Sequence, residues 1–166
     1  QVLCAHVTGW GRQPLKFRVD VAMMCKLGFD IGIAGMSEEE QLFCREAVSH
    51  FKRLSPVILQ GDFYRLVSPY ETNHASVMHV AKDRGKAVVY AYDMHPRFGE
   101  KLFPVKLQGL DPQKKYKVEE INLLPGKKSR LRENDAVFSG DYLMKVGLDL
   151  LTTAHTSSRI IELTVQ

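Results

Sequence analysis

Four acidic residues, Asp20, Asp30, Asp62 and Glu71, are the side chains from which a catalytic pair of carboxylates could be built. General acid and general base catalysis needs two such groups held close to the reacting bond. Asp20 falls on a predicted helix and Asp62 at a predicted domain junction, where a surface charge or a turn hydrogen bond is the simpler interpretation. We therefore expect no catalytic residue among the four.

The histidines and cysteines do not stand at the spacing of a metal site. Cys4 and His6 are two residues apart, and His74 and His79 fall on a segment that passes from loop to strand. A closed zinc site needs four ligands, and the sequence contains no Cys-x-x-Cys or His-Glu-x-x-His pattern. It also lacks a Gly-x-Ser-x-Gly elbow and a glycine-rich phosphate loop. We predict neither a metal nor a cofactor.

The first third of the chain begins with the pattern of a strand followed by a helix. A short apolar run spans Val2 to Val7, and after a loop with two glycines Pro14 is placed to open a helix. Apolar residues then recur at helical spacing to Leu27, and Gly28 provides a stop in the left-handed conformation. The pattern predicts one strand-helix unit.

A second strand and a second helix follow directly. Residues 29–33 form another short apolar run, and Ser37 with Glu40 has the spacing of a capping box. The helix over residues 38–54 is limited by Pro56. Two strand-helix units in succession are the building blocks of a parallel α/β layer or of a barrel.

Beyond Gly61 the apolar period changes from helical to about two residues, which is typical of strands. In the run that ends at Tyr92, Val88 and Tyr90 point the same way as Tyr92 while the residues between them point the other way, so we expect both faces to be covered. A hairpin turn is predicted at residues 83–85. The predicted strands are 77–82, 86–92, 102–107, 116–121, 146–151 and 160–165. Six or more strands of this kind predict an antiparallel β-sandwich.

Composition and charge are those of an ordinary globular protein. The chain has 166 residues, 45% of them hydrophobic and 25% charged, with a net charge of +4. The basic run at 127–132 has no interleaved aromatic platform, so we expect a solvated loop and no nucleic-acid partner. Three cysteines in apolar surroundings predict buried thiols rather than a disulfide framework. We expect no membrane span; the compartment stays open, with the cytoplasm slightly favoured.

A series of short motifs runs through nearly the whole chain. They are His6-Val7-Thr8, Gly28-Phe29, Ser37-Glu38-Glu39-Glu40, Gln60-Gly61-Asp62-Phe63-Tyr64-Arg65-Leu66, Gly109-Leu110-Asp111-Pro112 and Ser139-Gly140, together with Arg18, Ser68-Pro69, Tyr116, Leu143-Met144 and Gly147-Leu148. Each motif is weak alone, but the series in this order is specific. It resembles the C-terminal end of the α-galactosidases of glycoside hydrolase family 36.

The resemblance implies a fold and a division into two parts. Members of that family have a catalytic (β/α)8 barrel followed by an antiparallel β-sandwich. We expect residues 1–60 to be the last two strand-helix units of the barrel and residues 61–166 to be the sandwich. The chain would then be mainly β with an N-terminal α/β remnant. A whole barrel takes about 250 residues, so we expect a fragment whose missing partners are the N-terminal and barrel domains.

The resemblance also implies a reaction. Family members are retaining glycosidases with two aspartates, and such chemistry places two carboxylates about 5–5.5 Å apart around the sugar. The nucleophile lies in a Lys-x-Asp motif and the acid/base in a Ser-Asp-Asn motif, and neither motif occurs in this sequence. We therefore expect an inactive piece of an enzyme that removes terminal α-linked galactose from oligosaccharides.

His6 and Trp10 are the residues that this resemblance places nearest to a substrate. His6 lies near the carboxyl end of the first predicted strand, the end at which barrels carry the substrate site. Trp10 follows in the next loop and could offer an apolar ring to a sugar face. A histidine hydrogen-bonded at a strand end and a tryptophan packed between domains are the alternative interpretations.

Two other functions remain open at the level of sequence. The sandwich could bind galactosides through exposed tyrosines such as Tyr64, Tyr70 or Tyr142, or it could serve only to pack and to oligomerise. Helices taken out of a barrel would expose apolar residues such as Phe17 and Phe51. We expect them to dock on the sandwich or on another copy, which leaves a homo-oligomer open.

Overall fold

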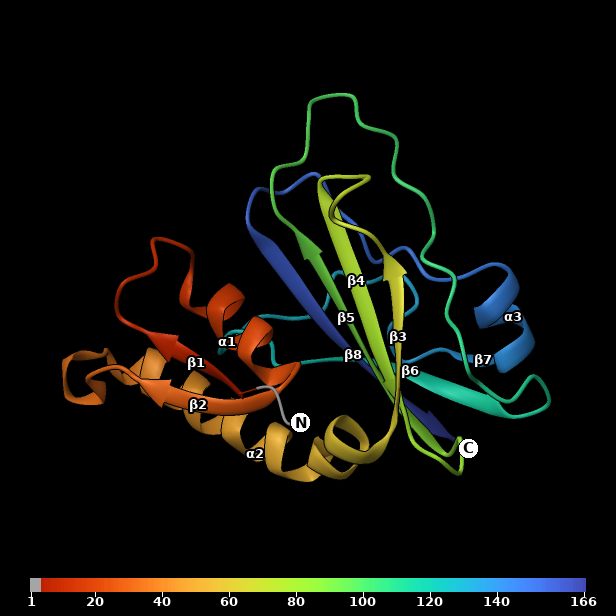
Figure 1. Ribbon diagram of the computed structural model, residues 1–166, viewed down its shortest axis with the longest axis horizontal. Helices are drawn as coiled ribbons and strands as arrows, with labels where there is room; N and C mark the ends of the chain where they lie inside the picture. Colours follow the sequence, from red (N-terminus) through yellow and green to blue (C-terminus); the bar gives the residue numbers. More distant parts are fainter. Residues whose placement is uncertain (1–3) are drawn as a thin grey trace.

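A parallel strand pair with its connecting helix opens the described part of the chain, residues 4–166 of the computed structural model (Figure 1). Strand β1 (Cys4–Thr8) pairs in parallel with β2 (Lys26–Asp30), and helix α1 (Leu15–Met23) connects them. A parallel pair needs such a crossover because the chain must return to the same end of the sheet. The predicted strand-helix unit is confirmed, although its start at Val2 lies outside the described residues.

Strand β2 begins earlier than the apolar pattern predicts, and Gly28 lies inside it. Gly28 is therefore not a helix stop; it pairs with His6 of β1. A Cβ atom at position 28 would lie 2.6 Å from Cδ2 of His6, so glycine is what lets the imidazole ring approach this backbone. Helix α1 ends instead in tightened turns, in which the N–H groups of Met24 and Cys25 donate to carbonyls three residues back.

Helix α2 (Glu38–Gln60) follows a single 3-10 turn, η1 (Ile33–Gly35). Its predicted capping box is confirmed. Ser37 Oγ accepts a hydrogen bond from the N–H of Glu40, and the Glu40 carboxylate accepts one from the N–H of Ser37. The three glutamates of the first turn also suit the positive end of the helix dipole.

The prediction that Pro56 limits α2 is wrong, because the helix continues through it to Gln60. Proline has no N–H to donate to the carbonyl one turn earlier, which here belongs to Lys52. The hydroxyl of Ser55 donates to that carbonyl at 3.0 Å and replaces the missing bond. A local hydroxyl therefore makes an internal proline tolerable in this helix.

The rest of the chain builds a six-stranded antiparallel sheet in the order β3-β4-β5-β8-β6-β7. The strands are β3 (Asp62–Val67), β4 (His74–Val80), β5 (Lys86–Asp93), β6 (Lys115–Ile121), β7 (Val137–Ser139) and β8 (Ser157–Val165). The predicted hairpin between β4 and β5 is confirmed, with Arg84 at a φ of 55° in its turn. Strand β8, the last in the chain, lies between β5 and β6, so the sheet is incomplete without the C-terminus.

Both faces of this sheet are covered, as the alternation in β5 predicts. Ala87 and Val89 belong to an apolar cluster with residues 105–110 and 143–150. Val88 and Tyr90 belong to a second cluster, which they share with α1, α2, β1 and β2. Figure 1 shows helices α1 and α2 beside one face of the sheet, and α3 with the irregular segments of the C-terminal half on the other side.

The second layer of the sandwich contains less regular strand than predicted. Residues 102–107 and 146–151 are extended, and a single antiparallel bridge joins Val105 to Leu148. Between β7 and Leu148 the chain forms a short helix, α3 (Gly140–Lys145), whose N-terminus is capped by the hydroxyl of Ser139. Few backbone hydrogen bonds link the two segments, because they pack through side chains.

The predicted fold class is confirmed: a mainly antiparallel β domain is preceded by a parallel strand-helix remnant. Phe17 of α1 and Phe51 of α2 are half-buried against the helix-facing cluster of the sheet. The helices therefore dock on the β domain, one of the two partners predicted for them. In the described part of the chain, no helix has both the length and the apolar character needed to cross a membrane.

Candidate functional site

The exposed face of the β1–β2 pair carries the first predicted site residue. Side chains alternate along β1, so that Val7 is buried against the helices while His6 faces solvent. The ring of His6 lies across the backbone of Gly28. Because β1 and β2 run parallel, their carboxyl ends at Thr8 and Asp30 meet at one edge, the edge at which a barrel carries its site.

The second predicted site residue lies just beyond that edge. Trp10 is in the loop after β1 and exposes 88% of its surface. Arg18 of α1 reaches back to this loop and donates a hydrogen bond from Nη1 to the carbonyl of Thr8. A Cβ atom at Gly11 would come within 3.0 Å of the Arg18 side chain, so the loop backbone packs closely on it. The structure thus places Trp10 just beyond the carboxyl end of β1 and His6 at the middle of that strand, one residue further from the end than Val7, and α1 holds the start of the loop.

The four acidic candidates lie in four separate environments. Asp30 is exposed at the end of β2, and Glu71 is exposed in the loop between β3 and β4. Asp62 begins β3 and forms an ion pair with Lys82, in agreement with the predicted surface charge. Each therefore has a local structural role or lies free in solvent.

The prediction of a surface charge at Asp20 is wrong, because this residue is completely buried. Its Oδ2 accepts hydrogen bonds from the Lys16 ammonium and from the Ser158 hydroxyl, each at 2.6 Å, and its Oδ1 accepts one from the Asn122 amide at 2.5 Å. Burial raises the pKa of the Asp20 carboxyl, while Lys16 and the hydrogen bonds act to lower it. The carboxylate ties α1 to strand β8 and to the end of β6.

Side chains from the sheet also cap the C-terminal end of α1. The hydroxyls of Tyr92 and Tyr90 donate to the carbonyls of Asp20 and Met23 at 3.1 and 3.0 Å. Nε2 of His79 lies 3.2 Å from the carbonyl of Met24. The last carbonyls of a helix have no partner within it, so these three side chains satisfy groups that would otherwise be buried unpaired.

Burial changes the titration of these capping groups in a consistent direction. It raises the pKa of the Tyr90 and Tyr92 phenols and lowers the pKa of the His79 imidazole. All three groups are therefore neutral around pH 7. A neutral imidazole can donate from Nε2 to a helix carbonyl and needs no counter-ion.

The three tyrosines considered for sugar binding have different surroundings. Tyr64 packs on the core of the sandwich, with its ring against Gly109. Tyr142 stacks on Phe138, with ring centroids 4.9 Å apart and an angle of 13° between the planes. Tyr70 exposes 98% of its surface in the β3–β4 loop. Of the three, Tyr70 has the ring that is free to meet a ligand.

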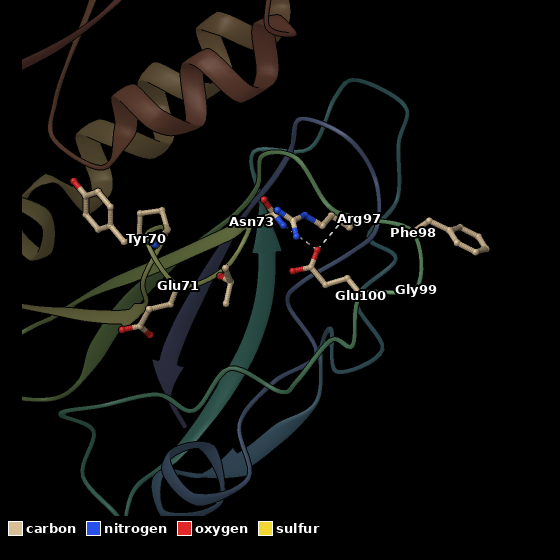
Figure 2. A pocket seen from close by; sticks show the side chains of 9 residues that line it. Tyr70, Glu71, Asn73, Arg97, Phe98, Gly99 and Glu100 are labelled. Carbon is tan, nitrogen blue, oxygen red and sulfur yellow. Dashed lines mark hydrogen bonds between the residues drawn. The ribbon is translucent and has the colours of Figure 1, made fainter.

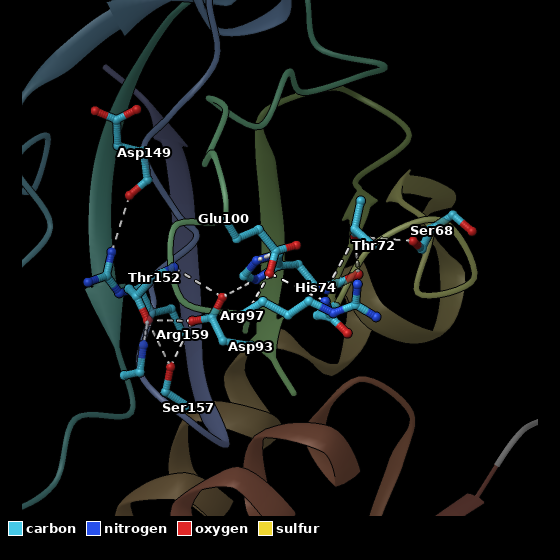
Figure 3. Close-up of polar contacts among 12 residues, drawn as sticks. Ser68, Thr72, His74, Asp93, Arg97, Glu100, Asp149, Thr152, Ser157 and Arg159 are labelled. Carbon is cyan, nitrogen blue, oxygen red and sulfur yellow. Dashed lines mark hydrogen bonds and ion pairs between the residues drawn. The ribbon is translucent and has the colours of Figure 1, made fainter. Parts of the chain in front are cut away.

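A second buried polar cluster lies at the far end of the sheet (Figure 3). His74 and Asp93 each expose 2% of their surface, and Nδ1 of His74 lies 2.7 Å from Oδ1 of Asp93. The backbone N–H and the hydroxyl of Thr152 also bond to Asp93, at 3.0 and 2.7 Å, and the Ser157 hydroxyl does so at 2.7 Å. Nε2 of His74 faces Oε1 of Glu100 at 3.7 Å. The cluster joins β4, β5 and β8 to the loop that carries Glu100.

This cluster does not have the geometry of a nucleophilic triad. In a triad the hydroxyl lies on the histidine nitrogen that is remote from the aspartate. Here Thr152 and Ser157 bind the aspartate itself, so the histidine cannot activate either hydroxyl. Sequence reasoning missed the cluster because its members are spread over 84 positions, from His74 to Ser157, with no diagnostic spacing.

Comparison with known proteins finds similarity along most of the chain. The profile of the glycosyl hydrolase family 36 C-terminal domain matches residues 74–163, which hold most of the antiparallel sheet. Probable alpha-galactosidase C of Aspergillus terreus is 32% identical over 149 residues, which are 89% of this chain and 18% of that protein. This chain spans about a fifth of the length of the curated relatives it matches.

Solved structures show the same relation. The crystal structure of the alpha-galactosidase AgaB from Geobacillus stearothermophilus superimposes with a TM-score of 0.84 at 28% identity, covering 98% of this chain and 21% of AgaB. A variant of AgaA from the same organism, crystallised in complex with raffinose, superimposes with a TM-score of 0.82 at 26% identity. That match covers 99% of this chain and 22% of AgaA.

Proposed function

This chain belongs to glycosyl hydrolase family 36, and we propose that it is the C-terminal part of an α-galactosidase that removes terminal α-linked galactose from oligosaccharides. The proposal rests on the match to AgaB, in which 98% of this chain superimposes on 21% of the AgaB chain. The raffinose complex of AgaA supports an oligosaccharide as the substrate.

The proposed division places the barrel remnant in residues 1–60 and the sandwich in residues 61–166. It is supported by the change from a parallel strand pair to an antiparallel sheet, which occurs between the end of α2 at Gln60 and the start of β3 at Asp62. The two parts share a buried interface, so the boundary is one of topology rather than of independent folding.

The proposed mechanism is the retaining one, with both reacting carboxylates in a part of the enzyme other than these residues. It needs a nucleophile and an acid/base about 5–5.5 Å apart, and the four acidic candidates here serve other roles or none. His6 and Trp10 are proposed to line the galactoside site, His6 as a hydrogen-bonding group and Trp10 as an apolar wall. The β domain contributes by holding α1, whose Arg18 bonds to the strand end that precedes Trp10.

The first test measures turnover of a chromogenic α-galactoside by the 166-residue chain. We expect none, because the chain lacks the acid pair. Sustained hydrolysis that survives repurification would contradict the proposed location of the reacting groups.

The second test reads the coding sequence upstream of the Gln1 codon. We expect an open frame that encodes a Lys-x-Asp and a Ser-Asp-Asn motif. In that longer protein, substitution of either aspartate by Asn should abolish turnover, whereas His6→Ala and Trp10→Ala should chiefly raise KM. A frame without either motif would sink the proposed activity.

A further inference from the structure

A polar pocket opens beside the buried His74–Asp93 pair, at the end of the sheet where β3 and β4 meet the loop after β5 (Figure 2). Its volume is about 500 Å³, and it lies between residues 69–73 and residues 97–100. Figure 2 shows Asn73, Arg97 and Glu100 close together in the middle of this surface. We call it the Glu100 pocket.

Glu100 is held in place from three directions. Its Oε2 accepts hydrogen bonds from the backbone N–H of Arg97 at 2.9 Å and from the Asn73 amide at 3.3 Å. Its Oε1 faces Nε2 of His74 at 3.7 Å. The Arg97 N–H first, and then the Asn73 amide and His74, lower the pKa of the Glu100 carboxyl despite a smaller opposing effect of desolvation. Glu100 is therefore an ionised acceptor whose orientation is fixed before any ligand arrives.

His74 supplies the second unusual feature of this pocket. Its Nδ1 is committed to Asp93, whose two oxygens are in turn bonded by Thr152 and Ser157. Its Nε2 is buried and has no hydrogen-bond partner among residues 4–166. A separation of 3.7 Å from Glu100 is too long for a hydrogen bond, and an unpaired buried polar atom is destabilising. Nε2 is covered and His74 is not among the residues that line the pocket, so His74 lies behind Glu100 and does not itself meet a ligand.

The charges around the pocket select the kind of ligand. Two carboxylates, Glu71 and Glu100, and one guanidinium, Arg97, line the pocket, so an anion would meet a net negative surface. A hard cation such as Ca²⁺ takes six to eight oxygen ligands, which two carboxylates on separate loops do not supply. Neutral vicinal hydroxyls suit this set, because they donate to the carboxylate and accept from the guanidinium and amide.

Aromatic rings stand at both ends of the pocket. Tyr70 and Phe98 are fully exposed, and in Figure 2 they lie at opposite sides of the polar centre. Exposed apolar rings beside a polar floor are suited to ligands with both apolar C–H faces and hydroxyl groups.

We propose that the Glu100 pocket binds an oligosaccharide through vicinal hydroxyls, at a place separate from β1 and the loop after it, which carry His6 and Trp10. Glu100 accepts hydrogen bonds from the sugar hydroxyls, Arg97 and Asn73 donate to them, and Tyr70 lies beside an outer sugar ring. The pocket binds and does no chemistry. In an α-galactosidase it would hold a second stretch of the substrate chain or a second substrate molecule.

Titration of the 166-residue chain with raffinose tests this proposal. We expect a calorimetric signal at millimolar sugar, together with amide shifts in NMR spectra that are confined to residues 69–73 and 97–100. Arg97→Ala and Glu100→Gln should each weaken binding by roughly tenfold, since each removes a hydrogen bond to a charged group. Tyr70→Ala should weaken it by a few-fold.

Matched controls separate this pocket from other sites. Lys101→Ala, an exposed change next to Glu100 that is outside the pocket lining, should leave the affinity within twofold. Arg97 is exposed, so its alanine variant should fold, and a thermal melt checks this.

Three results would overturn the proposal: no binding at millimolar raffinose, binding that Arg97→Ala and Glu100→Gln leave intact, or binding that disappears with His6→Ala. Binding of inorganic phosphate without binding of raffinose would likewise show the wrong ligand class. The experiment does not depend on turnover. A coding sequence without the two aspartate motifs would end the proposed activity while leaving this pocket's binding in place.

Discussion

On one face of the six-stranded sheet, Tyr90 and Tyr92 hydrogen-bond to the end of helix α1, whereas on the other face Ala87 and Val89 belong to an apolar cluster with Leu148. The helix-facing side also contains the buried Asp20 carboxylate and the ion pair between Arg53 of α2 and Glu162 of β8. The side that faces residues 105–110 and 143–150 is held mainly by burial of apolar surface.

The two faces of the sheet therefore hold their neighbouring segments by two different kinds of contact. Apolar burial is non-directional, so it can hold extended segments that share one β-bridge without specifying every atom. Hydrogen bonds to helix carbonyls are directional, and they set the position of α1 along its axis. The helix in turn holds the strand end that precedes Trp10, so the directional contacts lie where precise placement would serve the proposed substrate site.

Removal of the Asp20 carboxylate, on the helix-facing side of the sheet, should cause the largest loss of stability. Asp20→Ala leaves the Asn122 amide and the Ser158 hydroxyl buried without their acceptor, and we expect a loss of about 3 kcal/mol or more in the free energy of unfolding. Urea denaturation of the 166-residue chain measures it. Asp30→Ala, at an exposed strand end, is the matched control and should change stability by less than about 0.5 kcal/mol. Equal effects of the two changes would refute the importance of the buried carboxylate.

A substitution that leaves a cavity tests the packing on the apolar face of the sheet. Leu148 is completely buried, and Leu148→Ala should lower the unfolding free energy by about 3 kcal/mol through lost burial and incomplete collapse of the cavity. Hydrogen exchange on the same variant should show faster exchange in residues 105–110 while the amides of α1 keep their relative protection. Uniform loss of protection in both regions would mean that the two faces are not distinct.

A fall in pH should weaken the contacts on the helix-facing side of the sheet before those on the apolar side. Burial acts to raise the pKa of Glu162, but hydrogen bonds and charge from Arg53 and Lys86 outweigh it, so the folded-state pKa lies below the ordinary value. The stability that this depressed pKa contributes is present above the unfolded-state pKa and is lost as the pH falls through the folded-state value. His79 adds to the loss below about pH 6.5, since its lowered pKa means that the unfolded state takes up the proton first.

Glu162→Gln measures this acid sensitivity. We expect it to lower stability at pH 7 by about 2 kcal/mol and to flatten the dependence of unfolding free energy on pH between 6 and 3. Glu119→Gln, on the exposed side of β6, provides the comparison. A wild-type stability that stays constant over that pH range would rule out the role given to the Glu162 pairs.

The smallest expected effect belongs to a single helix cap. Tyr90→Phe removes the hydroxyl that donates to the Met23 carbonyl and leaves the ring in place, so stability should fall by about 1 kcal/mol. Val88→Ala, on the same face, provides a packing-only contrast. Faster exchange of the amides near the end of α1 in the Tyr90 variant, but not in the Val88 variant, would support the directional role of the cap. Faster exchange in the Val88 variant alone would contradict it.

Features whose determinants lie within a few residues were predictable from the sequence. The Ser37–Glu40 capping box, the hairpin turn at 83–85 and the two-sided burial of β5 are all confirmed, because each depends on neighbours three residues away or on simple alternation. The motif series likewise led to the correct family. Where a local rule has a local exception, as at Pro56 with the Ser55 hydroxyl, the pattern alone predicted the wrong end of the helix.

The amino-acid sequence by itself determined the change from strand-helix units to antiparallel strands, the apolar faces of β5 and the family, but it missed β3, β7 and α3. Tertiary structure alone decided that Asp20 is buried, that β4 and β5 cap α1, and that His74 stands behind Glu100. Asp20 meets Asn122 and Ser158 across 102 and 138 positions, and Asp93 meets Thr152 across 59. Whether a charge is buried depends on such distant partners, which fold topology brings together and which no local spacing encodes.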